Sequence, residues 1–268
     1  MKTKYKTFPP LFKFKHYMIK KKQNELTNIA QIIKKAQSKK ELLYYINNIT
    51  VRDIKKIERR TVGQSSNTNW FYYRRGVITG TTTYRIVNAV KKGKENENIN
   101  NAISKLYNQQ LFYPAIKYGR DNEQNAIDAF TKIIRPKHHG LKIKQVGLRL
   151  DHNHPYIGGS ADGEVQCLCC KNMILEVKCP FSIKDHSVKT HGHQLAYLND
   201  KLELRKNHYY YYQIQTYLGI YGYDKAYFCI WTKKDTHIII IEYDHQLWLN
   251  MKSNLCKYYF DFYLKHLV

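Results

Sequence analysis

Two segments that alternate apolar and polar residues, 158–165 and 174–180, constrain the fold most strongly. Gly and Pro bound them, so each predicts a β-strand. Positions 162 and 176 lie equally far from position 169, and a symmetric hairpin centred there places Asp162 directly opposite Glu176. Opposed residues of an antiparallel pair have Cβ atoms roughly 4.5–5.5 Å apart, and like charges there are destabilising. A divalent cation between the two carboxylates removes this repulsion, so the hairpin predicts a metal site.

Lys178 extends this arrangement along the second strand. Since side chains alternate across a strand, Lys178 projects from the same face as Glu176, whereas Leu175 and Val177 point to the opposite, apolar face. An Asp followed by Glu-x-Lys on the neighbouring strand is the arrangement of a metal-dependent phosphodiester nuclease, in which the carboxylates hold a hard cation such as Mg²⁺. The lysine would position or deprotonate the attacking water. An exposed hairpin with scattered charges is the alternative, which the apolar neighbours disfavour because unpaired charge is costly in a buried strand.

The charge balance indicates a polyanionic partner. The 268 residues include 45 Lys and Arg against 21 Asp and Glu, a net charge of +24. Such a balance predicts binding to nucleic acid. An anionic membrane surface is the alternative, and no strongly amphipathic basic helix supports it.

We predict two parts of the chain: a basic N-terminal arm and helical extension over residues 1–66, and an α/β domain over residues 67–268. Residues 1–60 hold 17 Lys and Arg against four Asp and Glu. Residues 1–22 have little pattern, which predicts a flexible arm, and apolar residues at helical spacing between positions 26 and 57 predict two or three short helices. Residues 63–69 have the composition of a linker.

The sequence also bears on the cellular compartment. No stretch approaches the ~18 apolar residues of a membrane span, and residues 1–22 lack the apolar core of a secretory signal. Six cysteines at irregular spacing, without secretory context, indicate a reducing compartment. We therefore expect an intracellular protein, in the nucleus or the cytoplasm, that is neither secreted nor held in a membrane.

The rest of the chain alternates helical and strand patterns. Apolar spacing predicts helices at 96–107, 119–134, 208–223 and 245–264, and strands at 141–151, 225–232 and 237–243. The predicted fold is α/β, a mixed central sheet flanked by helices.

Glu123 falls on the apolar stripe of the helix expected at 119–134, together with Ile127 and Phe130. A carboxylate in this position must either reach solvent at the helix end or find a cation, because burying an unpaired charge is costly. The spacing alone leaves both interpretations open.

The run from Trp70 to Thr81 combines aromatic, basic, Gly and Thr residues. One interpretation is a helix end that packs on a core. The other is a phosphate contact, with Arg74 as a charged fork and Thr81 near the N-terminus of the next helix, where anions bind. The residues by themselves do not decide between these two.

Four segments in a fixed order resemble the PD-(D/E)XK nuclease superfamily, in its YqaJ-type viral recombinase branch, the phage lambda exonuclease family. The resemblance covers about residue 70 to the C-terminus. The matching segments are Trp70-x₃-Arg74 with Gly76, Ile78, Thr79 and Thr81; Gly119-x₃-Glu123-x₂-Ala126; Ser160-Ala161-Asp162-Gly163 with Leu175-Glu176-Val177-Lys178-Cys179-Pro180; and Tyr212-Gln213-Ile214-Gln215. Ala161 stands where the family usually has Pro, and Thr81 stands where it usually has Ser.

This resemblance implies a restriction-endonuclease-like core and a Mg²⁺-dependent DNA exonuclease, with Mn²⁺ as a substitute metal, that acts 5′ to 3′ on duplex ends in viral or mobile-element recombination. The implied metal ligands are Glu123, Asp162, Glu176 and the carbonyl of Val177. The implied catalytic residues are Asp162, Glu176, Lys178 and Gln213, and Arg74 and Thr81 are implied to hold the 5′ phosphate. Family members can form a ring trimer and work with a single-strand annealing protein. An endonuclease of the same superfamily and a catalytically inactive DNA-binding domain are the alternatives.

A cysteine cluster falls at the predicted hairpin turn: Cys167, Cys169 and Cys170. Cys179 lies down the return strand, on the order of 30 Å from the turn at about 3.3 Å per residue, which is too far to share one ion. Cys-x-Cys-Cys lacks the usual Cys-x₂-Cys spacing of structural zinc, so we predict free thiols rather than a zinc or iron–sulfur site.

Four histidines flank the strand expected at 141–151. These are His138, His139, His152 and His154. No pair of them has a convincing ligand spacing, and we interpret each as a loop histidine.

Overall fold

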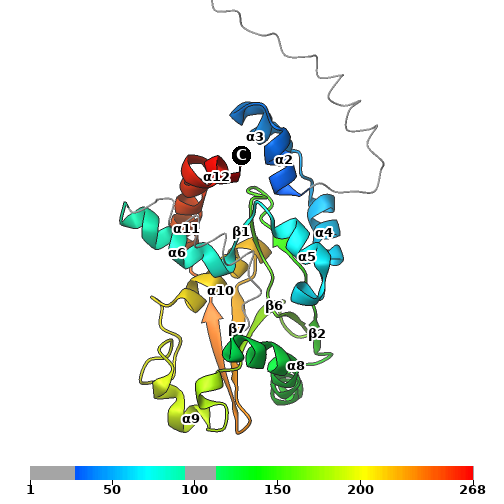
Figure 1. Ribbon diagram of the computed structural model, residues 1–268. Helices are drawn as coiled ribbons and strands as arrows, with labels where there is room; N and C mark the ends of the chain where they lie inside the picture. Colours follow the sequence, from blue (N-terminus) through cyan, green and yellow to red (C-terminus); the bar gives the residue numbers. More distant parts are fainter. Residues whose placement is uncertain (1–27, 94–112, 268) are drawn as a thin grey trace, which may run out of the picture.

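In the computed structural model, which describes residues 28–93 and 113–267, a five-stranded mixed sheet forms the centre of the fold (Figure 1). Its strands, in spatial order, are β2 (Lys142–Lys144), β5 (Gly163–Gln166), β6 (Met173–Lys178), β7 (Lys225–Trp231) and β8 (Thr236–Glu242). The β6–β7 pair is parallel and the other pairs are antiparallel. A second, three-stranded sheet has the order β1 (Ile78–Thr79), β4 (Ile157–Gly159), β3 (Arg149–Leu150). The prediction of a mixed central sheet is confirmed.

The β5–β6 hairpin has the register that its sequence predicts. The paired residues are Gly163 with Leu175, Glu164 with Ile174, and Val165 with Met173. Each pair is symmetric about the centre expected for Asp162 and Glu176. Asp162 itself lies just before strand β5, and its carboxylate accepts a hydrogen bond from the backbone amide of Val177 at 2.7 Å.

Two expected strands are each divided between the two sheets, so both predictions of a continuous strand are wrong. The segment 158–165 leaves β4 after Gly159 and enters β5 at Gly163, and the segment 141–151 contains both β2 and β3. The physical reason is that the two ends of each segment pack in different places. Ile157 is buried in one hydrophobic cluster and Val165 in another, and one straight strand cannot reach both.

The two faces of β6 pack against different helices. Leu175 and Val177 share a buried cluster with α8 (Pro114–Ile134), whereas Ile174 shares a cluster with α10 (Tyr209–Tyr221). The predicted alternation across this strand is therefore confirmed. Glu176 and Lys178 lie on the strand positions that alternate with the α8-facing residues.

The remaining helices complete the layers around the sheets (Figure 1). They are α6 (Gly80–Lys91), η2 (Arg135–Lys137), η3 (Phe181–Ile183), α9 (Val188–His191), η4 (Gly192–Gln194), α11 (His245–Tyr258), the π-helical turn η5 (Tyr259–Tyr263) and α12 (Leu264–Leu267). The helix expected at 96–107 lies outside the described residues. Each helix within 28–93 and 113–267 is too short or too polar to cross a membrane.

Three short helices are described at the N-terminal end: α2 (Ile29–Lys35), α3 (Lys39–Asn47) and α4 (Val51–Arg60). Side chains of Asn28, Ser38 and Thr50 cap their first turns, as short polar side chains do at helix N-termini. The buried isoleucines of these helices belong to the same hydrophobic cluster as β1 and α11, so the helices pack directly on the core. The arm expected at residues 1–22 lies outside the described part of the chain.

The segment 63–69 is not a loose linker, contrary to its composition. It forms the turn η1 (Gln64–Ser66) and the start of α5 (Thr68–Arg74). The side-chain amide of Gln64 donates a hydrogen bond to the backbone carbonyl of Ala161 at 2.7 Å. This contact fixes the segment to the chain immediately before Asp162.

Candidate active site

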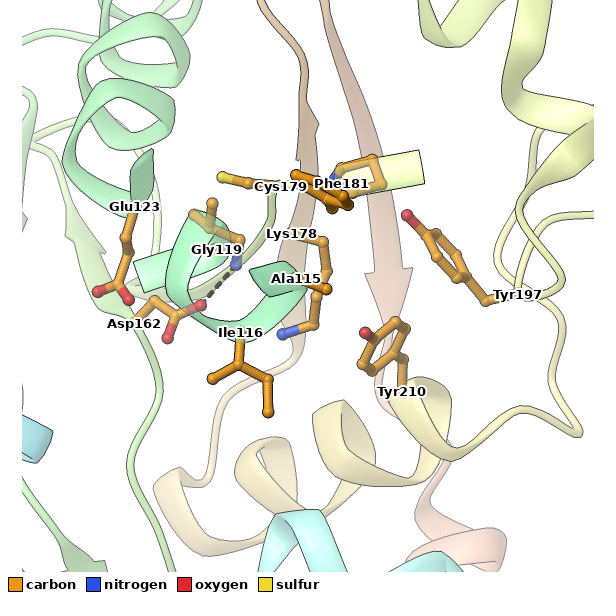
Figure 2. Close-up of a pocket in the computed structure, with 12 residues that line it drawn as sticks. Ala115, Ile116, Gly119, Glu123, Asp162, Lys178, Cys179, Phe181, Tyr197 and Tyr210 are labelled. Carbon is orange, nitrogen blue, oxygen red and sulfur yellow. Dashed lines mark hydrogen bonds between the residues drawn. The ribbon is translucent and has the colours of Figure 1, made fainter. Parts of the chain in front are cut away.

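A pocket at the end of β6 gathers acidic, basic and aromatic side chains (Figure 2). It is lined by Glu123 from α8, Asp162 from the short connection between β4 and β5, and Lys178 from the end of β6. Figure 2 shows the carboxylates of Glu123 and Asp162 next to each other, with the Lys178 ammonium pointing toward them. Tyr197 and Tyr210 close the opposite side of the pocket.

The three residues between β4 and β5, 160–162, are held by hydrogen bonds that position Asp162. Trp70 donates its indole N–H to the hydroxyl of Ser160 at 2.8 Å, and Gln64 binds the carbonyl of Ala161. Asp162 then accepts the Val177 amide, the hydrogen bond drawn as a dashed line in Figure 2. Hydrogen bonds from α5 and η1 therefore hold the carboxylate beside β6.

Glu176 is 1% exposed and forms an ion pair with Lys178, whose Nζ lies 2.5 Å from Oε1 of the carboxylate. Its second oxygen, Oε2, is buried and has no hydrogen-bond partner among the described residues. Burial, and after it the charge of Asp162, raises the pKa of Glu176 to about 8. An orphaned buried carboxylate oxygen is costly unless a cation or donor reaches it.

The pKa values of the other two carboxyl groups, Glu123 and Asp162, are raised as well. Burial and then the charge of Asp162 raise the pKa of Glu123 to about 7. Burial also raises the pKa of Asp162, which Lys178 and the Val177 amide only partly offset. Three neighbouring carboxyl groups thus resist ionisation, and their oxygen atoms are the kind of ligand that a hard divalent cation such as Mg²⁺ prefers.

Gln213, on α10, contacts a tyrosine whose hydroxyl senses the charge of Glu176. It is buried, and its side-chain amide donates to the hydroxyl of Tyr217 at 2.7 Å. Burial, and after it the charge of Glu176, raises the pKa of Tyr217 well above its usual range. The contact that the structure gives Gln213 thus runs through Tyr217.

The two residues expected to hold a phosphate lie on one chain of contacts. The Arg74 guanidinium stacks over the Trp70 ring at 3.8 Å and donates to the Thr79 hydroxyl at 3.3 Å. The Thr79 hydroxyl lies 3.0 Å from that of Thr81, at the start of helix α6. Because Trp70 also binds Ser160, this group joins the segment that carries Asp162.

Sequence reasoning missed one further polar cluster. His138, interpreted as a loop histidine, lies within 3.5 Å of the sulfur atoms of Cys167, Cys169 and Cys170. Pairing of β2 with β5 brings the segment after α8 to the hairpin turn. A strand pairing across about 20 residues leaves no signal in the local spacing of Cys and His.

The sheet order and the flanking helices are those of the PD-(D/E)XK type of α/β fold. Residues 69–224 match the YqaJ-like viral recombinase domain, and the chain belongs to this family.

Solved structures show the same fold. The alkaline exonuclease LHK-Exo from Laribacter hongkongensis superposes with a TM-score of 0.52 at 20% identity, covering 74% of this chain and 91% of that one. Its complex with dAMP gives 0.53 at 21% identity, with the same coverage of both chains. A SOX–DNA complex gives 0.54 at 10% identity, covering 86% of this chain and 76% of that one. No curated protein matches the chain in sequence.

Proposed function

We propose that this chain is a metal-dependent DNA exonuclease that degrades duplex DNA from 5′ ends. The observation that carries the proposal is that Glu123, Asp162 and Lys178 line one pocket at the end of β6, where Lys178 also pairs with buried Glu176. Family membership supports it, as does the similarity in fold to an alkaline exonuclease, to its dAMP complex and to a SOX–DNA complex.

Each residue of the site has a proposed role. Glu123, Asp162, Glu176 and the carbonyl of Val177 would hold Mg²⁺, for which Mn²⁺ could substitute. A bound divalent ion stabilises charge on a phosphoryl oxygen and lowers the pKa of bound water. Lys178 would orient or activate the attacking water from its position against Glu176, and Gln213 would assist through Tyr217, whose hydroxyl it binds.

Arg74 and Thr81 would bind the terminal 5′ phosphate. Both lie beside the segment that leads to Asp162, linked to it through Trp70 and Ser160. A guanidinium and a helix N-terminus favour the extra charge of a terminal phosphate over an internal diester. By family resemblance, the product would be single-stranded DNA for an annealing protein in viral or mobile-element recombination.

The decisive test is digestion of end-labelled linear duplex with Mg²⁺, carried out with 5′-phosphate and 5′-hydroxyl ends, beside a closed circular plasmid. We expect release of mononucleotides from the 5′ end, faster with the phosphate, no cutting of the circle, and no digestion in EDTA. Cutting of the circle would instead identify an endonuclease. DNA binding without any cleavage would identify an inactive binding domain.

A further inference from the structure

A second cluster of metal-binding side chains lies away from the pocket, at the tip of the β5–β6 hairpin. Cys167, Cys169 and Cys170 occupy the turn, and His138 follows η2 in the segment that leads to β2. One ligand atom from each of the four lies within 4.8 Å of every other. The four side chains therefore surround a common point.

The separations match a tetrahedral ion. Zinc–sulfur bonds of ~2.3 Å and zinc–nitrogen bonds of ~2.0 Å at tetrahedral angles give S···S separations of ~3.8 Å and S···N separations of ~3.5 Å. Cys169 Sγ lies 3.6 Å from the sulfurs of both Cys167 and Cys170. Nδ1 of His138 lies 3.5, 3.5 and 3.2 Å from Cys167, Cys169 and Cys170.

Neither disulfide formation nor ordinary hydrogen bonding accounts for this arrangement. A disulfide needs sulfurs at about 2.05 Å, far less than the separations here. One imidazole nitrogen has a single lone pair, so it accepts one hydrogen bond and not three. An iron–sulfur cluster spreads its protein ligands over different iron atoms, which requires a wider cage than these four atoms form.

The surroundings of His138 orient it as a ligand. Its second ring nitrogen, Nε2, lies 3.3 Å from the hydroxyl of Tyr227 on β7, the kind of outer contact that fixes the tautomer of a metal-bound histidine. The backbone amide of Leu168, within the turn, donates to the carbonyl of His139 at 2.9 Å. These contacts hold the histidine loop against the cysteine turn.

We propose that His138, Cys167, Cys169 and Cys170 bind one structural zinc ion. Three thiolates and one imidazole select zinc over the hard cations that suit the oxygen-lined pocket, and four protein ligands leave no open position for catalysis. The ion would tie the end of α8, the helix that carries Glu123, to the hairpin that carries Glu176. It would thereby hold two parts of the active site in a fixed relation.

The test is the zinc content of the full-length chain, purified without a histidine tag and measured by plasma mass spectrometry. We expect one zinc per chain in the wild type, in Asp162→Asn and in the control Cys256→Ser, whose cysteine lies outside the cluster. Cys169→Ser and His138→Ala should lose zinc. Zinc that remained in both cluster variants, or was lost from Asp162→Asn, would overturn the proposal, as would iron with sulfide, or a Cys–Cys disulfide, in the wild type.

A second measurement serves if the cluster variants fail to fold. Zinc is removed from the wild-type chain with a chelator, and Co²⁺ is added in steps. We expect one equivalent to produce the visible and thiolate charge-transfer absorption of tetrahedral cobalt; absorption typical of octahedral cobalt alone would overturn the proposal. Tyr227→Phe should keep the stoichiometry and weaken zinc binding about 10-fold or more, the usual cost of losing an outer contact. Both readouts are independent of nuclease activity.

Discussion

At the scale of single residues, the carboxyl groups of the candidate site lie close to one another and resist ionisation. Glu176 keeps one buried oxygen without a partner among the described residues, and the pKa values of Glu123, Asp162 and Glu176 are all raised. Replacing a carboxylate by the amide of the same size would therefore remove a proposed metal ligand and keep the volume of the side chain.

Asp162→Asn and Glu176→Gln should abolish DNA cleavage while duplex binding, measured by fluorescence anisotropy in EDTA, is retained. Lys178→Ala should slow cleavage by about 10²–10⁴-fold, the usual worth of a positioned proton-transfer group. Exposed Lys171, which pairs with Asp224 on the surface, provides the matched control: Lys171→Ala should leave the rate unchanged. Full activity in Asp162→Asn would contradict the assigned site.

The raised pKa of Glu176, about 8, also predicts how stability depends on pH. An unfolded Glu titrates near ~4.3, so the folded carboxyl holds its proton more tightly, and the stability of the metal-free protein should fall as pH rises from ~4.3 towards 8. Since a cation competes with that proton, Mg²⁺ should raise the melting temperature more at pH 8 than at pH 6.

Melting curves with EDTA and with Mg²⁺, at both pH values, check this. His154 contributes a fall of the same sign, because its hydrogen bond with Asp151 raises its pKa to about 9. Glu176→Gln therefore serves as the control. In this variant the part of the pH dependence of stability that Glu176 contributes should disappear, and the part that His154 contributes should remain. Equal stabilisation by Mg²⁺ at pH 6 and pH 8 would be inconsistent with the site.

At the scale of elements, α5, β1 and α6 form one unit in which Arg74 and Thr81 meet through Thr79. Arg74→Ala should slow digestion of 5′-phosphorylated duplex far more than that of 5′-hydroxyl duplex. The neighbouring Arg75 is exposed and ends the same helix, so Arg75→Ala should preserve the preference. If Arg74→Ala slowed both substrates equally, Arg74 would be a general backbone contact.

A buried ionic network joins α4 to the two sheets. Arg149 on β3 donates two hydrogen bonds to Glu58, at 2.8 and 3.0 Å, and lies 3.8 Å from Glu164 on β5. Its guanidinium also stacks on Tyr221 at 3.9 Å. Removing the cation takes away the ion-pair partner of buried Glu58, whereas Glu164 keeps hydrogen bonds from Tyr223, Gln166 and Asn172. Breaking a buried ion pair from one side costs about 3–5 kcal/mol.

Arg149→Met should accordingly lower the free energy of unfolding by an amount of that order, measured by urea denaturation. Arg149→Lys should also destabilise, since an ammonium cannot replace the two-pronged hydrogen bonds. Glu58→Gln combined with Arg149→Met should recover part of the loss, because it removes the carboxylate charge that has lost its partner. A wild-type midpoint in Arg149→Met would rule out the structural role of the network.

At the scale of the whole molecule, the excess of positive charge is concentrated at the N-terminal end. Residues 1–27 hold eight Lys and one Glu, whereas α2 to α4 share a hydrophobic cluster with the core. Deleting residues 1–27 should weaken duplex affinity and flatten its dependence on salt, because log K falls by about 0.9 per neutralised phosphate for each decade of salt. Binding isotherms at several salt concentrations measure the slope. An unchanged slope would assign the segment to some other partner.

The sequence by itself determined those features that depend on neighbouring positions. The symmetric register of the β5–β6 hairpin and the opposite faces of Leu175 and Glu176 follow from local alternation and spacing, and the structure confirms them. The strands expected at 225–232 and 237–243 are β7 and β8, whose ends differ from the prediction by at most one residue. The roles proposed for Glu123 and Arg74 needed family resemblance in addition, because the residues by themselves allowed two interpretations of each.

Only the tertiary structure decided the features that join distant positions. The break between β4 and β5, the contact of Gln64 with Ala161, the Glu58–Arg149–Glu164 network and the approach of His138 to the cysteines each join segments through packing of separate elements. Such contacts depend on which elements lie side by side. Local propensity and periodicity carry no information about that, because they reflect only the conformation of residues within a few positions of one another.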